Sequence, residues 1–157
     1  MKTTGILVAD QTLARLFTIR HPKDPLEEIA DLNNAKGRLH DSDIDSDRPG
    51  RTFDTMGMGR HAMSKQHSAT TQQEIRFAGL IGDLLADHLR RDDFQRLVLC
   101  APPKLLGFLR EALSEPVVES VFMELGKDFV HLEEKDIRAH LMKELPAIVQ
   151  PARSPAA

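Results

Sequence analysis

A basic stretch from Arg48 to Gln66, RPGRTFDTMGMGRHAMSKQ, holds the side chains of this sequence that are best suited to binding chemistry. Its cations are Arg48, Arg51, Arg60 and Lys65, and one carboxylate accompanies them, so the net charge is +3 with the histidines neutral. Clustered Lys and Arg side chains bind phosphate groups without reading a base sequence. The glycines of the stretch let a backbone approach a crowded surface. The stretch therefore indicates a phosphate-binding segment; the alternative is a solvated loop without a ligand.

Four aspartates at alternate positions lie just before this stretch, at Asp41, Asp43, Asp45 and Asp47. Their spacing is similar to that of an EF-hand calcium loop, which needs glycine at its sixth position and glutamate at its twelfth. Counted from Asp41, those positions hold Ser46 and Thr52. We therefore predict a solvated acidic run and no metal site. A metal-binding or small-molecule-binding module that uses these aspartates and the histidines is the alternative.

Histidine and cysteine add little further chemistry. His61 and His67 are six positions apart with no third ligand nearby in the sequence, which is a weak zinc pattern. Cys100 falls in an apolar run and is predicted to be a small core residue. The sequence contains no nucleophile elbow, phosphate-binding P-loop or dinucleotide-binding glycine fingerprint. We predict no catalytic residues and no cofactor, and enzyme activity is not indicated.

Composition sets the class of protein. The 157 residues suit one domain, and 41% hydrophobic with 29% charged residues is typical of a globular protein. A net charge of −3 predicts no strong attraction of the whole chain to nucleic acid or membrane, so such binding needs a local patch. A single cysteine excludes an internal disulfide and favours a reducing compartment. Neither a signal peptide nor a membrane-spanning run is visible, which predicts a cytoplasmic protein.

The elements that must position the basic stretch begin with a predicted hairpin. The apolar run 5–9 is typical of a buried strand, residues 10–12 form a polar turn, and the β-rich run 14–19 returns. Residues 26–32 are predicted to form a third strand, with a short helix as the alternative. A long exposed loop, about residues 36–69, follows and contains both the acidic run and the whole basic stretch.

A long helix is predicted after this loop, over about residues 70–90. Thr71 and Glu74 fit a capping box, in which the hydroxyl and the carboxylate each accept from an otherwise unpaired backbone N–H. Apolar residues at helical spacing predict one buried stripe, made of Ile75, Ala78, Ile81, Leu85 and Leu89. Gly79 and Gly82 weaken a helix by roughly 1 kcal/mol each against alanine, so we interpret both as close-packing positions.

The remaining chain alternates strands and helices. We predict a buried strand at 97–101, a helix at 105–113, a short helix from Pro116 to Leu125 that stops at Gly126, a strand at 129–132 and a helix at 133–145. Such alternation indicates parallel crossovers. We predict a single layered α/β domain over 1–145, with a mixed β-sheet flanked by helices, and a flexible tail at 146–157.

Four stretches of the sequence resemble a known family in order and spacing: ILVADQTLARLF, SDRPGRTFDTMGMGRHAM, FQRLVLCAPPKLLGFLREAL and ELGKDFVHL. With the intervening helix they span most of residues 4–140. The chain resembles the bacterial host attachment protein family, a bacterial branch of the archaeal and eukaryotic release-factor superfamily. The resemblance implies the fold of the release-factor middle domain, in which a long exposed loop precedes a long helix.

The resemblance also implies a molecular role. In release factors the corresponding loop ends in Gly-Gly-Gln and promotes hydrolysis of peptidyl-tRNA, whereas this sequence reads Gly57-Met58-Gly59-Arg60-His61 there. We therefore expect a non-catalytic factor that binds the ribosome or ribosomal RNA in rescue, hibernation or a stress response. The residues predicted to bind RNA are Arg48, Arg51, Gly57, Gly59, Arg60, His61, Lys65 and Gln66. The alternatives are a protein-interaction role in attachment to host cells and a peptidyl-tRNA hydrolase.

Overall fold

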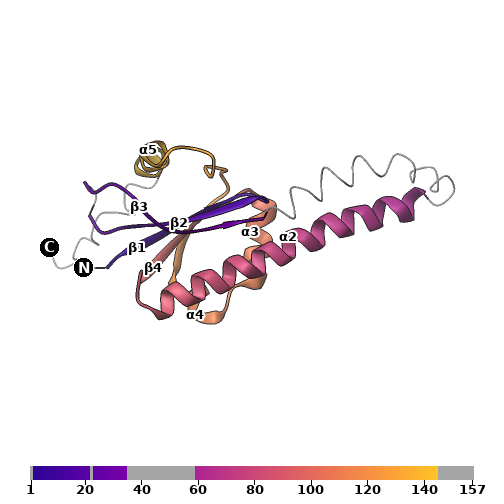
Figure 1. The fold of residues 1–157 in the computed structure, drawn as a ribbon, viewed down its shortest axis with the longest axis horizontal. Coiled ribbons are helices and arrows are strands. Elements are labelled where there is room, and N and C mark those ends of the chain that lie inside the picture. Colours follow the sequence, from indigo (N-terminus) through magenta and orange to yellow (C-terminus); the bar gives the residue numbers. More distant parts are fainter. Residues whose placement is uncertain (1, 22, 35–58, 145–157) are drawn as a thin grey trace.

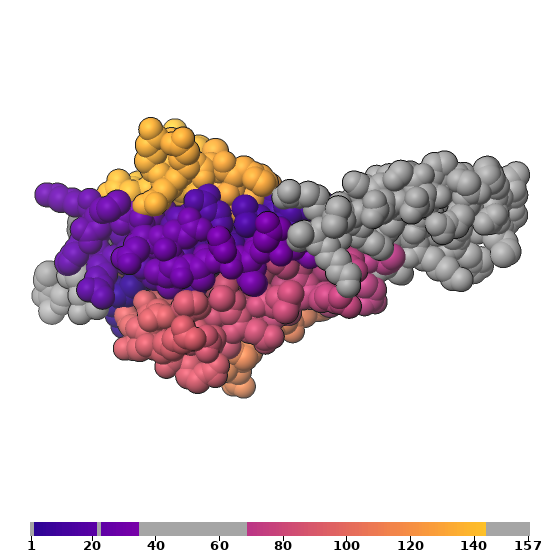
Figure 2. Space-filling model, viewed as in Figure 1, coloured from indigo at the N-terminus to yellow at the C-terminus, as the bar shows by residue number. Residues whose placement is uncertain are grey.

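A computed structural model describes residues 2–21, 23–34 and 59–144, and the side chains of 2–21, 23–34 and 69–143. Within these ranges the chain forms a five-stranded sheet in the order β3-β2-β1-β4-β5. Helices cover both faces of the sheet, with α5 on one side and α2, α3 and α4 on the other (Figure 1). Figure 2 shows the same layering, since the indigo and purple strands lie between the yellow α5 and the pink α2.

The amino-terminal half is an antiparallel meander. Strand β1 (Thr4–Ala9) pairs antiparallel with β2 (Leu13–Ile19), which pairs antiparallel with β3 (Glu27–Asn33). The turn between the first two strands is built on Asp10, whose Oδ1 accepts hydrogen bonds from the N–H groups of Thr12 and Leu13 at 2.8 and 2.9 Å. The predicted hairpin and its polar turn are confirmed, and residues 27–33 form the predicted strand rather than the alternative helix.

The second half adds parallel strands to the other edge of β1. Strand β4 (Arg96–Cys100) pairs parallel with β1, and β5 (Val121–Leu125) pairs parallel with β4. Because β1 lies between an antiparallel and a parallel neighbour, all six of its residues are buried. The predicted α/β class with a mixed sheet flanked by helices is therefore confirmed.

Helices connect and cover these strands. Helix α2 (Gly59–Arg90) leads to β4, whereas α3 (Pro103–Ala112) and α4 (Glu115–Ser120) lie between β4 and β5. Helix α5 (Glu134–Glu144) follows β5. Within the described ranges, no helix combines the length and the apolar character that crossing a bilayer requires.

Alternate residues of the central strands fill two apolar cores, one on each face of the sheet. Leu7 and Leu99 point toward α2 and pack with Ile81 and Leu85 of that helix. Ile6, Val8 and Val98 belong to the opposite core, together with Ile137 and Leu141 of α5. A Cβ atom at Gly5 would lie 2.8 Å from Cγ of the buried Phe94, so this position of β1 requires glycine. The predicted core position of Cys100 is confirmed, and burial raises the pKa of its thiol to about 12.

Two predicted elements near the end of the chain were wrong. Residues 121–125 form β5 instead of continuing a helix, because they pair with β4, which local sequence does not reveal. Residues 129–132 form a turn rather than a strand. Phe129 and Val130 are apolar because they are buried in the core beneath α5. The Arg15 guanidinium donates from Nη1 to the carbonyl oxygens of Val130 and Leu132 at 3.0 and 2.9 Å, which holds the turn against β2.

The predicted start of the long helix was also wrong. Helix α2 begins at Gly59, so residues 59–69 are helical rather than loop, and Thr71 lies inside the helix. Ala62, Met63, Lys65 and Gln66 are good helix formers, and no proline interrupts the run. The predicted stripe is confirmed at Ala78, Ile81 and Leu85, which are fully buried, whereas Ile75 is 44% exposed.

Candidate functional site

The residues predicted to bind RNA fall into two groups. Arg48, Arg51 and Gly57 lie outside the described residues. The remaining positions, Gly59, Arg60, His61, Lys65 and Gln66, lie in the first part of α2. Helix α2 has 32 residues and is about 48 Å long at roughly 1.5 Å per residue. Its magenta beginning extends past the end of the sheet (Figure 1). The structure therefore places this second group at the outer end of a long helix.

The end of the sheet from which α2 extends is held together by contacts between residues that are distant in the sequence. Asp10 directly follows β1, and its Oδ2 lies 2.8 Å from Nε2 of His131. Burial raises the pKa of the Asp10 carboxyl, but hydrogen bonds from Thr12, Leu13 and His131 outweigh this effect and hold the pKa below its usual value. The pair ties the turn after β1 to the turn before α5.

The chain leaves β3 at the same edge. The backbone N–H of Asn34 donates to the carbonyl oxygen of Thr12 at 2.7 Å, and its side-chain amide donates to that of Gln11 at 3.0 Å. Asn34 is the last described residue before position 59. Asn34 is therefore fixed to the turn after β1.

A small cavity of about 270 Å³ opens at this edge, at the carboxyl ends of β1 and β4. Glu74 of α2 lines this cavity, and its side chain is only 8% exposed. Its Oε1 atom forms an ion pair with Nζ of Lys104 at 3.1 Å. In open α/β sheets, ligands bind at this end of the strands. The Lys104 side chain is half exposed, and its ammonium retains N–H donors beyond the one aimed at Glu74, so it can also bind an anionic group.

The Glu74 contact replaces the predicted capping box. That motif requires the Glu74 carboxylate to accept from a backbone N–H at a helix start. Helix α2 continues through this position, and the carboxylate pairs with α3 instead. Among the described residues, no group of three His, Cys, Asp or Glu side chains is arranged to hold a metal ion.

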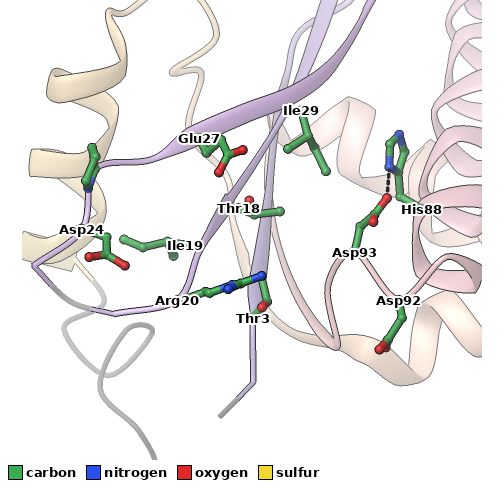
Figure 3. Close-up of a pocket in the computed structure, with 11 residues that line it drawn as sticks. Thr3, Thr18, Ile19, Arg20, Asp24, Glu27, Ile29, His88, Asp92 and Asp93 are labelled. Atoms are coloured by element: carbon green, nitrogen blue, oxygen red, sulfur yellow. Dashed lines mark hydrogen bonds and ion pairs between the residues drawn. The ribbon is translucent and has the colours of Figure 1, made fainter.

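A larger cavity of about 520 Å³ lies at the opposite end of the sheet, between the β2–β3 connection and the end of α2 (Figure 3). Arg20, Asp24 and Glu27 line one side of it, and His88 and Asp93 the other. His88 is buried, and its Nδ1 lies 2.7 Å from Oδ2 of Asp93. This pair joins the end of α2 to the turn before β4. The cavity lies at the end of α2 opposite to its outer end, so it is separate from those predicted RNA-binding residues that lie on this helix.

A family model described as bacterial archaeo-eukaryotic release factor family 12 matches residues 3–141. The match covers every described strand and most of α5, and it places the chain in the bacterial branch of the release-factor superfamily. The chain belongs to bacterial archaeo-eukaryotic release factor family 12.

Among solved structures, the chain is similar to the crystal structure of an archaeal translation termination factor, aRF1, with 9% sequence identity and a TM-score of 0.42. The similarity covers 92% of this chain and 39% of that chain, so this chain spans well under half of that protein. Among curated proteins, none matches. The superfamily part of the predicted resemblance is confirmed by the family model, and the host-attachment part stays a prediction.

Proposed function

We propose that this protein is a non-catalytic translation factor that binds the ribosome, or another structured RNA, through the basic stretch 48–66. The observation that carries the proposal is membership of a release-factor family over residues 3–141. The net charge of +3 in this stretch, within a chain of net charge −3, supports it, because cations concentrated in one segment favour contact with phosphate groups.

The described geometry suits such a role. Phe77, Ile81 and Leu85 of α2 are buried against the sheet, so the later part of the helix is firmly anchored. The first part extends beyond the sheet and carries Arg60 and Lys65 (Figure 1). A helix anchored over several turns holds its outer end at a fixed distance from the body. This arrangement would let the basic residues reach into a recess of a large RNA surface while the body remains outside.

The sequence argues against a hydrolytic version of this role. Gly-Gly-Gln is absent, and the corresponding residues are Gly57-Met58-Gly59-Arg60-His61. Cys100 is no alternative nucleophile, because its thiol is buried and its pKa is about 12. A role in host attachment would then be an indirect consequence of altered translation, since nothing in the described residues favours a surface adhesin.

The proposal predicts a salt-dependent affinity for ribosomal RNA. Replacing Arg51→Ala together with Arg60→Ala removes two phosphate contacts, and the slope of log K against log salt should become shallower by roughly 1.5 to 2. The matched control is the double variant Lys23→Ala, Lys135→Ala, which removes the same amount of positive charge from exposed positions of the body. Filter binding at several salt concentrations measures both. Equal slopes for the two double variants would contradict the proposed site.

A further inference from the structure

The outward face of α2 carries large apolar side chains that the fold does not bury. Ile75 is 44% exposed and Leu80 is 48% exposed, whereas Phe77, Ala78, Ile81 and Leu85 of the same helix are buried. Figure 2 shows part of this helix, in pink, at the molecular surface. At about 100° per residue, Ile75 and Leu80 lie about 140° apart around the helix, at the two margins of its exposed side. Exposed apolar side chains of this size can serve as part of an interaction surface.

Gly79 lies between these two residues and has no role within the described fold. A Cβ atom built at Gly79 would have nothing within 4 Å. By contrast, a Cβ atom at Gly82, less than one helical turn further on, would lie 3.2 Å from the carbonyl oxygen of Ala112. Glycine weakens a helix relative to alanine. The interpretation of both glycines as close-packing positions is therefore confirmed for Gly82 and wrong for Gly79 within this chain.

Two charges of opposite sign flank Gly79 and Leu80 on the same face. Arg76 lies three positions before Gly79, and Asp83 lies three positions after Leu80. Both are exposed, and neither side chain makes an ion pair or a hydrogen bond with another described residue. The next acidic residue on the helix, Asp87, pairs with Arg90 and Arg91. The charges that bracket the glycine are thus available to a partner.

We infer that α2 packs antiparallel against α2 of a second copy of this chain, with a two-fold axis between Gly79 and Leu80. In such a pair, positions equally far from the centre lie opposite one another. Arg76 of each copy then lies beside Asp83 of the other, which forms two equivalent ion pairs. The two Leu80 side chains meet beside the axis, and each Gly79 lets the helices approach closely. The face is therefore complementary to itself in both shape and charge.

A groove of about 310 Å³ adjoins this face and extends the apolar surface. It is lined by Ala86, Leu89 and Arg90 of α2 and by residues of α4, including Pro116 and Val117. In the antiparallel register, Ile75 of the second copy points toward Ala86 at the edge of this groove. Contact along one helix and one groove is at the small end of interface sizes, so the dimer should dissociate on dilution.

Sedimentation equilibrium of the full chain tests this inference at concentrations up to about 0.5 mM, where an interface of modest affinity is populated. We expect a reversible monomer–dimer equilibrium for the natural sequence. Arg76→Glu alone and Asp83→Arg alone should each weaken the dimer about tenfold or more, because each places like charges opposite one another twice. Thermal melting should be nearly unchanged, since both positions are exposed.

Mixing the two single variants provides the decisive control. An Arg76→Glu chain and an Asp83→Arg chain form attractive pairs at both contacts, so their mixture should regain the dimer that neither forms alone. The double variant R76E/D83R should also regain it. A monomer at every concentration, or a dimer that neither single variant weakens, would overturn the inference. The second outcome would indicate a different surface for the second copy.

Discussion

The two faces of α2 differ in what the fold demands of them. On the inner face, Ile81 is fully buried and Gly82 lies against the carbonyl oxygen of Ala112. On the outer face, the neighbouring positions hold Leu80, which is half exposed, and Gly79, where an added Cβ atom would have nothing within 4 Å. Contacts within the chain explain the inner pair of residues and do not explain the outer pair. The difference shows which residue choices follow from folding and which point to a partner.

The strongest test of this difference compares Ile81→Ala with Leu80→Ala. Removing the buried Ile81 side chain leaves a cavity beneath the sheet and should lower the free energy of unfolding by about 3 to 4 kcal/mol. Leu80→Ala should lower it by less than about 1 kcal/mol, because the site is open to solvent. Urea unfolding of dilute protein measures both. Similar losses at the two positions would show that the outer face is packed in the folded monomer.

A second comparison, of Gly82→Leu with Gly79→Leu, should give smaller changes in the free energy of unfolding, but the two changes should have opposite signs. Both gain about the same helix propensity, so any difference between them reports packing. Gly82→Leu should lower the free energy of unfolding by about 2 kcal/mol, because the side chain meets the backbone of α3. Gly79→Leu should raise it by about 0.5 to 1 kcal/mol. Thermal melts of dilute samples measure both, and a loss of stability for Gly79→Leu would refute the open space at that position.

The smallest predicted effect on stability concerns Asp10, in the turn after β1. The pKa of Asp10 is lower in the folded protein than its usual value of 3.8, so its carboxylate stabilises the fold above that pH, and this contribution is lost as the pH falls through the folded pKa. Asp10→Ala should therefore cost about 1 kcal/mol at pH 7, where hydrogen bonds to the turn are lost. The difference from the natural sequence should shrink below about pH 4.

Urea unfolding between pH 7 and pH 3 measures this effect. The control is Asp31→Ala, because Asp31 is exposed and its side chain makes no ion pair or hydrogen bond with another described residue. Its effect should be small and nearly independent of pH. A constant difference between Asp10→Ala and the natural sequence down to pH 3 would show that Asp10 contributes through packing and not through its charge.

Local sequence predicted the parts of the fold whose signals are local. Continuous apolar runs identified β1 and β4, and the alternation of strands and helices in the second half predicted parallel strands; the particular partners of β4, which are β1 and β5, were not predicted. Strand β5 escaped prediction because no glycine or proline separates it from α4, and pairing with β4 decides its conformation. The apolar residues Phe129 and Val130 were mistaken for a strand because burial in a turn produces the same short apolar run.

Less of the candidate site was predictable. The basic stretch is evident from its composition, but its second part lies on α2, which Thr71 and Glu74 wrongly indicated to begin later. The pairs at the edge of the sheet, such as Asp10 with His131, join residues 121 positions apart. Asp10 was predicted only as part of a turn. The signal that could have identified it is its position directly after a buried strand, where ligand sites of α/β sheets lie.

The most direct test of the proposed function is sedimentation of the tagged protein in lysates of growing and starved cells, through sucrose gradients at low and high salt. We predict co-migration with ribosomal particles at low salt, and loss of co-migration at high salt and in the Arg51→Ala, Arg60→Ala variant. The Lys23→Ala, Lys135→Ala control should behave as the natural sequence does. Sedimentation as free protein under every condition would contradict ribosome binding and would direct the search to a protein partner, to be captured by cross-linking.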